Sequence, residues 1–211
     1  MDARDVAQFV QAAAAVGTAI AAWRGVSLWR EQLQGTVGFQ SARRALRSLA
    51  ELRVAFEQTR NAFMSPSEYS TRPTQSEETQ KEAEARDLWY GYQNRLEQLI
   101  RARNRLRKVE FDARAVFGLS AQEVIVPIYK HVNVLGGSAT TFFSLHLKNA
   151  REDSPPRVRD EQMAHLERFV WESTWDQDKF AQEISRDLVA AETFFRDFLP
   201  PPTPRKKRAS A

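Results

Sequence analysis

Apolar side chains recur at helical spacing along one continuous stretch of the chain, residues 88–116. Successive apolar positions are three or four residues apart, which places them on one stripe of an α-helix and is close to a heptad repeat. The stripe consists of Leu88, Tyr92, Leu96, Leu99, Ala102, Leu106, Val109, Ala113 and Val116. A helix of this length must cover its stripe with partner helices. The pattern therefore predicts a bundle of long helices, and it favours a homo-oligomer or a protein partner.

Composition also favours helices over sheets. Arg and Ala are abundant while Val, Ile and Thr are sparse, and the abundant pair forms helices more readily than strands. Cys is absent, which excludes disulfides, a Cys-based zinc site and a thiol nucleophile. With 211 residues the chain supports one domain with its own core. We predict an all-α fold, in which an N-terminal membrane-anchor helix continues into a bundle of about four long helices.

Capping and breaking residues predict where these helices begin and end. Ser76 is an N-cap candidate for the helix that carries the apolar stripe, and Ser120 opens the next helix in a capping box with Glu123. The adjacent glycines at 136–137 predict a kink or break in that helix. Residues 171–178 interrupt the apolar stripe of the last segment and predict a bend or break there. The predicted helices span residues 24–63, 76–118, 120–148 and 157–199.

An uncharged stretch near the N-terminus predicts a membrane anchor. Residues 6–23 hold 18 positions without a formal charge, the lower limit for a helix that spans a bilayer. Arg24 and Arg30 follow it, so the positive-inside rule places the N-terminus outside and the C-terminal side in the cytoplasm. We expect residues 1–23 to be a single-pass anchor and residues 24–199 a cytoplasmic bundle. Two alternatives stay open for this Ala-rich stretch, namely a helix packed in a soluble bundle and a helix lying in the membrane interface.

The net charge of +4 belongs to one short segment at the C-terminus. Arg205, Lys206, Lys207 and Arg208 carry it, and the rest of the chain holds equal numbers of acidic and basic residues. We expect residues 200–211 to be a disordered, Pro-rich basic tail. On the cytoplasmic side of the inner membrane, anionic lipid would attract this tail. Nucleic acid is the less favoured partner, because the body of the protein is neutral.

A second basic cluster lies on the stripe-bearing helix. Arg101, Arg103, Arg105, Arg107 and Lys108 are candidates for contact with nucleic acid or anionic lipid. They spread over more than one helical face, so solvated or ion-paired surface is the favoured interpretation. Charge also differs between helices, since the first is basic and the last is acidic. This pattern predicts that the basic helices pack around the acidic one.

No established catalytic motif occurs in the chain. There is no HExxH, no phosphate-binding Gly-rich loop and no GxSxG elbow, and we predict neither a metal nor a cofactor. Of the three His residues, His131 and His146 lie on an apolar segment and are expected to be hydrogen-bonded core residues.

The third, His165, follows Arg159 by six positions near the start of the last helical segment. This pair and its placement resemble the HEPN superfamily, whose members include metal-independent ribonucleases. The resemblance implies that Arg159 stabilises charge on the scissile phosphate and that His165 acts as general acid or base, with two protomers forming the site.

The architecture as a whole resembles two groups of bacterial proteins. An anchor, a helical body and the Arg–His pair together look like the HEPN-like membrane accessory proteins of RNA-targeting CRISPR systems. Trp29, Gln32, Leu33 and Gly35, spaced WxxQLxG, look like a feature of bacterial single-pass membrane-anchored helical proteins. The 24 Arg against 7 Lys suit a bacterium with a GC-rich genome.

Three hypotheses about function follow. The favoured one is a membrane-tethered helical bundle with an interaction, assembly or accessory role, with antiphage defence as one setting, and without a catalytic site. The alternative is a HEPN-type ribonuclease that uses Arg159 and His165. The third is a soluble helical interaction module.

Overall fold

The computed structural model describes residues 23–24, 35–74, 77–151, 157–172 and 178–200. The chain divides into two compact units, residues 1–40 and 41–211. All regular structure in the described ranges is helical, with no strand among them, which confirms the all-α prediction.

The predicted membrane anchor, residues 1–23, lies outside the described residues except for Trp23. Trp29, Gln32 and Leu33 also lie outside them, as does residue 201 onwards. Among the described helices, none combines the length and the apolar character that a membrane crossing requires.

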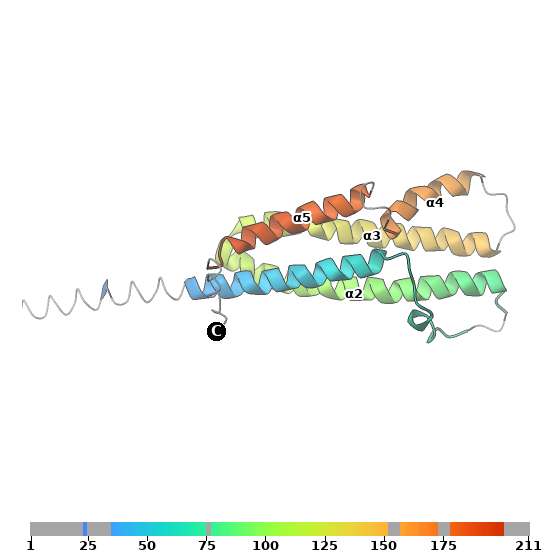
Figure 1. Ribbon diagram of the computed structural model, residues 1–211, viewed down its shortest axis with the longest axis horizontal. Helices are drawn as coiled ribbons and strands as arrows, with labels where there is room; N and C mark the ends of the chain where they lie inside the picture. Colours follow the sequence, from blue (N-terminus) through green and yellow to red (C-terminus); the bar gives the residue numbers. More distant parts are fainter. Residues whose placement is uncertain (1–22, 25–34, 75–76, 152–156, 173–177, 201–211) are drawn as a thin grey trace, which may run out of the picture. The chain divides into compact units, whose positions relative to one another are not determined.

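The second unit is a bundle of antiparallel helices (Figure 1). Its first helix is the part within this unit of a helical run over residues 35–60. This part, residues 41–60, is drawn blue to cyan without a label and is called helix 41–60 below. The others are α2 (Gln80–Phe117), α3 (Leu119–Arg151), α4 (Arg157–Val170) and α5 (Lys179–Arg196), with a short 3-10 turn, η1, at Pro66–Glu68. α3 packs against α2 as well as against α4 and α5.

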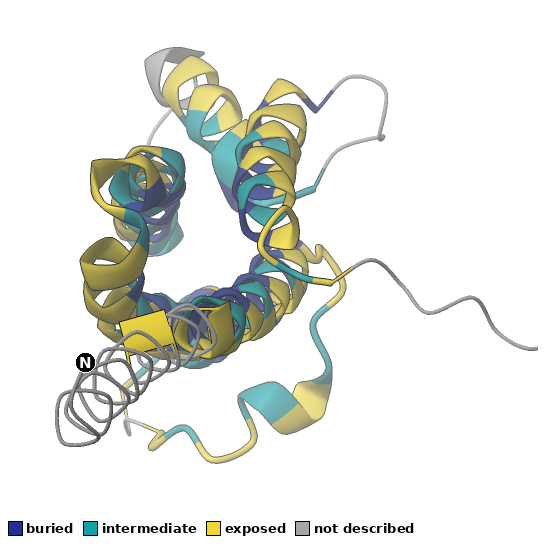
Figure 2. Ribbon diagram, turned by 90° about the vertical axis from the view of Figure 1, so that its left-hand side faces the viewer, coloured by how far each residue is buried: buried dark blue, intermediate teal, exposed yellow. Residues whose placement is uncertain are grey.

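Helix 41–60 is linked by ion pairs to both α2 and α5. Arg105 Nε lies 2.8 Å from Glu51 Oε2, and Arg53 Nη2 lies 2.7 Å from Glu192 Oε1. The second pair joins the basic first helix to the acidic last one, as the charge pattern predicts. Figure 2 looks along the bundle and shows the buried faces of the helices turned inward.

The core follows the apolar stripes predicted from the sequence. On α2 the middle of the stripe is fully enclosed, because Leu99 and Leu106 are 0% exposed, whereas Val116 at its end is 39% exposed. The largest fully buried side chains come from helix 41–60, α2, α3, α5 and the end of α4: Tyr92, Phe143, Phe195, Leu49, Leu52, Leu99, Leu106, Ile125, Ile128, Leu135, Leu188 and Val170. The heptad-like seam is therefore used inside the protomer.

The predicted N-cap of α2 at Ser76 is wrong, because the N-cap lies three residues later and the helix begins at Gln80. Thr79 is the N-cap, and its hydroxyl accepts the backbone N–H of Glu82 at 3.3 Å. The Glu82 carboxylate accepts the N–H of Thr79 at 3.1 Å, which completes a capping box. Glu78 lies outside the helix, where it holds Arg72 at 2.8 Å. This ion pair keeps the preceding residues in the loop.

The predicted boundaries of α3 need two corrections. Gly118, with φ at +72°, ends α2, and α3 starts at once with Leu119, so Ser120 lies inside the first turn instead of capping it. The helix also runs unbroken through the glycines at 136–137. Burial of Leu135 and Ala139 on the core side outweighs the roughly 1 kcal/mol that each glycine costs a helix.

The predicted break near residues 171–178 is confirmed, and one buried arginine stabilises it. Arg60, 4% exposed, ends helix 41–60 and donates hydrogen bonds of 3.0–3.1 Å to the carbonyl oxygens of Arg168, Phe169 and Trp171. The same guanidinium lies 2.8 Å from Asp178 Oδ2. Because these carbonyls come from the end of α4 and just beyond it, Arg60 acts as its C-terminal cap.

A second arginine, Arg95 on α2, holds the loop that follows helix 41–60. Its guanidinium donates to the carbonyl oxygens of Asn61 and Phe63 at 2.5 and 2.6 Å and to both oxygens of Glu68. The hydrogen bond from Arg95 is the main cause that lowers the pKa of Glu68 from its ordinary value of 4.5, against a smaller rise from burial.

This lowered pKa predicts acid sensitivity. The Glu68 carboxylate contributes its full stabilisation above its unfolded pKa of about 4.5; the contribution shrinks below that pH and is gone once the pH has passed below the folded pKa. We expect the difference in unfolding free energy between the wild type and Glu68→Gln to narrow steadily below that pH. Urea titrations at a series of pH values measure it. A difference that stays constant into strong acid would contradict the assignment.

Candidate functional site

Three arginines of α2 face a groove between α2 and α3. Arg103, Arg107 and Arg114 are four and seven residues apart, a spacing that puts them on one face of a helix. The groove has a volume of about 450 Å³, within the usual range for ligand sites. We call it the α2–α3 groove. Its lining residues are Arg103, Arg107, Glu110, Phe111, Arg114, Gln122, Val126, Tyr129 and Asn133.

The hydrogen bonds within the groove do not neutralise the positive charge of its three arginines. Tyr129 donates its hydroxyl to Glu110 Oε2 at 2.8 Å, and Arg103 Nη1 donates to Asn133 Oδ1 at 3.2 Å. Burial, and then the hydrogen bond to Glu110, raise the pKa of Tyr129, so its phenol stays neutral. Neither Arg107 nor Arg114 has a carboxylate partner among the described residues. The groove therefore presents three guanidinium groups against one carboxylate.

The other basic residues predicted on this helix lie elsewhere. Arg101 Nη2 is 2.7 Å from Glu97 Oε1, and Arg105 is paired with Glu51 across the interface with helix 41–60. Lys108 is exposed and does not line the groove. The predicted set of five thus divides, and Arg103 and Arg107 are the two that the structure brings together.

Sequence reasoning missed Arg114 and the α3 residues of the groove. Arg114 follows Arg107 by seven residues, and this spacing was a sufficient signal that both lie on one face. Tyr129 and Asn133 have no comparable signal, because their position opposite α2 depends on how α3 packs back after the turn at Gly118.

Exposed apolar side chains also occur near the α2–α3 turn, at one end of the bundle. Phe111 is 66% exposed and Leu119 is 61% exposed, and Val116 and Phe198 are exposed to a smaller degree. The ring of Phe198 lies 4.2 Å from that of Phe117, which brings the end of α5 to the α2–α3 turn. We call these four exposed residues, Phe111, Val116, Leu119 and Phe198, the apolar end.

The remaining predicted site residues are only partly described. His165 is exposed on α4, where its ring contacts the guanidinium of Arg168 and lies 5.6 Å from the ring of Phe169. Arg159 belongs to the same helix, but its side chain is outside the described structure. The pairing of Arg159 with His165 stays a prediction. The basic tail also lies outside the described residues: Arg205, Lys206, Lys207 and Arg208.

The other two histidines are half-buried and make contacts inside the bundle. His131 Nε2 is 2.8 Å from Asp187 Oδ2, and the His146 ring is stacked on Phe142 at 6.2 Å. Burial raises the pKa of Asp187, but hydrogen bonds from Arg186 and His131 outweigh it and lower the pKa overall. Within the described ranges, no three His, Asp or Glu side chains lie close enough together to hold a metal ion.

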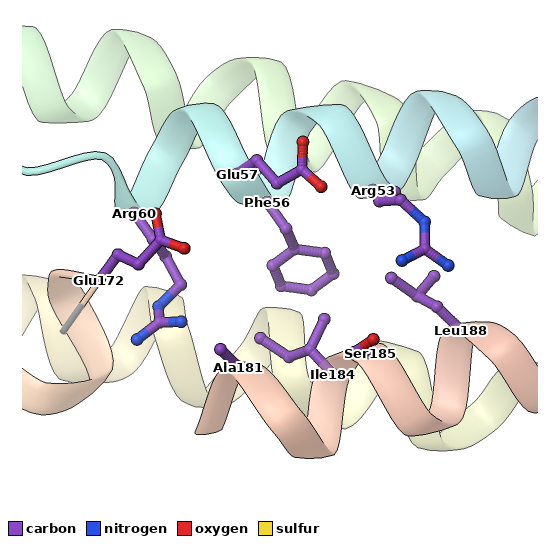
Figure 3. A pocket seen from close by; sticks show the side chains of 9 residues that line it. All are labelled: Arg53, Phe56, Glu57, Arg60, Glu172, Ala181, Ile184, Ser185 and Leu188. Atoms are coloured by element: carbon purple, nitrogen blue, oxygen red, sulfur yellow. The ribbon is translucent and has the colours of Figure 1, made fainter. Parts of the chain in front are cut away.

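A smaller cavity lies between helix 41–60 and α5 (Figure 3). Its volume is about 90 Å³, well below that of an ordinary ligand site. Phe56, Ile184 and Leu188 project between the two helices, and Arg53 extends from helix 41–60 toward Leu188 (Figure 3). We interpret it as a packing defect beside the buried Arg60.

The chain matches no family model, no curated protein and no solved structure. The α2–α3 groove and the apolar end are therefore the observations that bear on function.

Proposed function

We propose that the protein is a non-enzymatic helical bundle, tethered to the cytoplasmic face of the bacterial inner membrane, with an assembly or accessory role. The observation that carries this proposal is the apolar end. Exposed Phe and Leu side chains are costly in water, and a membrane interface removes them from it.

The chain's connections support the same orientation. Arg44 Nη1 lies 3.9 Å from Asp112 Oδ2, so the start of helix 41–60 lies at the same end as the α2–α3 turn. Phe198, next to the end of α5, contacts Phe117 there. The first residues of helix 41–60 and the end of α5 therefore both lie at the apolar end of the second unit. A membrane interface at this end would remove the exposed apolar side chains from water.

Membrane extraction tests the tether. We expect the full chain, expressed in bacteria, to remain in the membrane pellet after alkaline carbonate washing, because residues 6–23 span the bilayer. A variant that lacks residues 1–23 should move to the supernatant, whereas one that lacks residues 205–211 should stay in the pellet. Recovery of the full chain in the supernatant would overturn the proposal.

An RNA cleavage assay tests the absence of catalysis. The ribonuclease alternative is favoured by one observation, the exposed His165 with a guanidinium against its ring. We expect the purified full chain to leave RNA intact in EDTA. Cleavage that is lost in His165→Ala, with an unchanged melting temperature, would replace our proposal with the ribonuclease.

A further inference from the structure

We propose that the α2–α3 groove binds the phosphate headgroups of anionic phospholipids. This inference rests on the proposed function, because the tether brings the groove to a membrane. It adds a specific binding site to that function and names the chemical class of its ligand.

The arginine row has the geometry for phosphate. A guanidinium is planar and donates two parallel hydrogen bonds to neighbouring oxygens of one phosphate. Arg103 and Arg114 are eleven residues apart on α2, which is roughly 16 Å along the helix axis. A row of this length extends over more than one headgroup, so it suits a membrane surface better than a single small anion.

The charge in the groove is available to a ligand. Arg107 and Arg114 face no carboxylate among the described residues, and Glu110 is held by the neutral phenol of Tyr129. By contrast, Arg101 and Arg105 on the same helix are each bound to a glutamate. An anion in the groove therefore gains charge-assisted hydrogen bonds without displacing an existing ion pair.

Apolar side chains around the row favour lipid over nucleic acid. Phe111 lies in the groove between Arg107 and Arg114 in sequence and is 66% exposed. Single-stranded nucleic acid is held by rows of aromatic platforms on which bases stack. Of the two rings that line this groove, Tyr129 is half-buried with its hydroxyl bound to Glu110, so Phe111 is the one exposed ring there. A bilayer interface satisfies both features, because phosphates lie next to acyl chains.

The absence of Cys from the chain allows a direct test in the full-length protein. Phe111→Cys, labelled with an environment-sensitive fluorophore, reports whether the groove contacts lipid. We expect its emission to shift further to the blue in vesicles of phosphatidylcholine with phosphatidylglycerol than in vesicles of phosphatidylcholine alone. Phe63→Cys is the matched control, because Phe63 is also exposed, at 75%, and lies beyond the other end of helix 41–60. Its emission should not change.

Removing the arginine row should abolish this response. The triple variant Arg103→Gln, Arg107→Gln, Arg114→Gln loses three cations, so the ratio of lipid-contacting to aqueous label should fall on the order of a hundredfold. The control triple variant Arg47→Gln, Arg101→Gln, Arg105→Gln loses the same charge, but each of its arginines already faces a glutamate. It should retain the response to within about threefold.

The possible outcomes distinguish lipid binding by the α2–α3 groove from membrane attachment by residues 6–23. Full-length protein that floats with both kinds of vesicle, with the same emission of the Phe111 label on both, would overturn the groove and leave the tether. Flotation with anionic vesicles alone, lost in the groove triple variant, would support the groove and overturn the tether. If single-stranded RNA shifts the label and anionic vesicles do not, the ligand is nucleic acid and the lipid proposal is wrong.

Discussion

Replacing Arg60 by methionine is expected to lower the free energy of unfolding by about 3–5 kcal/mol. The substitution removes the cation that pairs with Asp178, whose side chain is 2% exposed, and leaves that buried carboxylate without its ion pair, although it still accepts the backbone N–H of Ala181. It also removes the donor that caps the carbonyl oxygens of Phe169 and Trp171. Urea unfolding followed by circular dichroism measures the loss.

Two further variants separate this buried charge from a general effect of losing an arginine. Arg47 lies on the same helix in an exposed ion pair with Glu51, so Arg47→Met should change stability by less than about 1 kcal/mol. Adding Asp178→Leu to Arg60→Met should recover part of the loss, since the buried charge is then gone, less the cost of the N-cap that Asp178 provides for α5. Equal stability of the Arg60 and Arg47 variants would refute the assignment.

Phe143→Ala is expected to cost about 3–5 kcal/mol, because it opens a cavity in an aromatic cluster. Phe143 is 1% exposed and lies at the centre of this cluster. Its ring is 4.9 Å from Trp89, 5.0 Å from Tyr92 and 6.0 Å from Trp171. Its ring thereby joins α2, α3 and the segment after α4. Removing the ring leaves a void, and the large aromatic neighbours cannot fill it without moving.

Calorimetric or urea unfolding of Phe143→Ala, compared with Phe63→Ala, tests this expectation. Phe63 is exposed because helix 41–60 ends three residues before it, so its truncation should cost little. A Phe143 variant as stable as the Phe63 variant would show that the cluster is loosely packed.

The helical core could be predicted from the sequence because its signal is local. Steps of three and four residues place Tyr92, Leu99 and Leu106 on one stripe whatever they pack against, and all three are buried. The break before α5 was also predictable, since polar residues interrupt the apolar stripe there. The first helix was predicted to reach residue 63, but it ends at residue 60 and Phe63 is exposed, because periodicity does not reveal where a helix ends.

Contacts between distant residues were beyond prediction. Arg60 and Asp178 are 118 positions apart, and no spacing rule connects them. The start of α2 moved from Ser76 to Thr79 because Glu78 is drawn to Arg72 in the loop. Arg103 and Arg107 were predicted as members of a local cluster of basic residues. The sequence did not show that they line the groove while Arg101 and Arg105 form ion pairs, because that depends on where the glutamates lie in the folded bundle.

Arg60 also determines how independently α4 can open. The helix contributes one fully buried side chain, Val170, and most of its remaining described residues are exposed or half-buried. On packing alone it would be a local unfolding unit of low stability. Hydrogen bonds from Arg60 to the carbonyl oxygens of Arg168 and Phe169 tie its last turn to helix 41–60. Opening of that turn is thereby coupled to unfolding of the core.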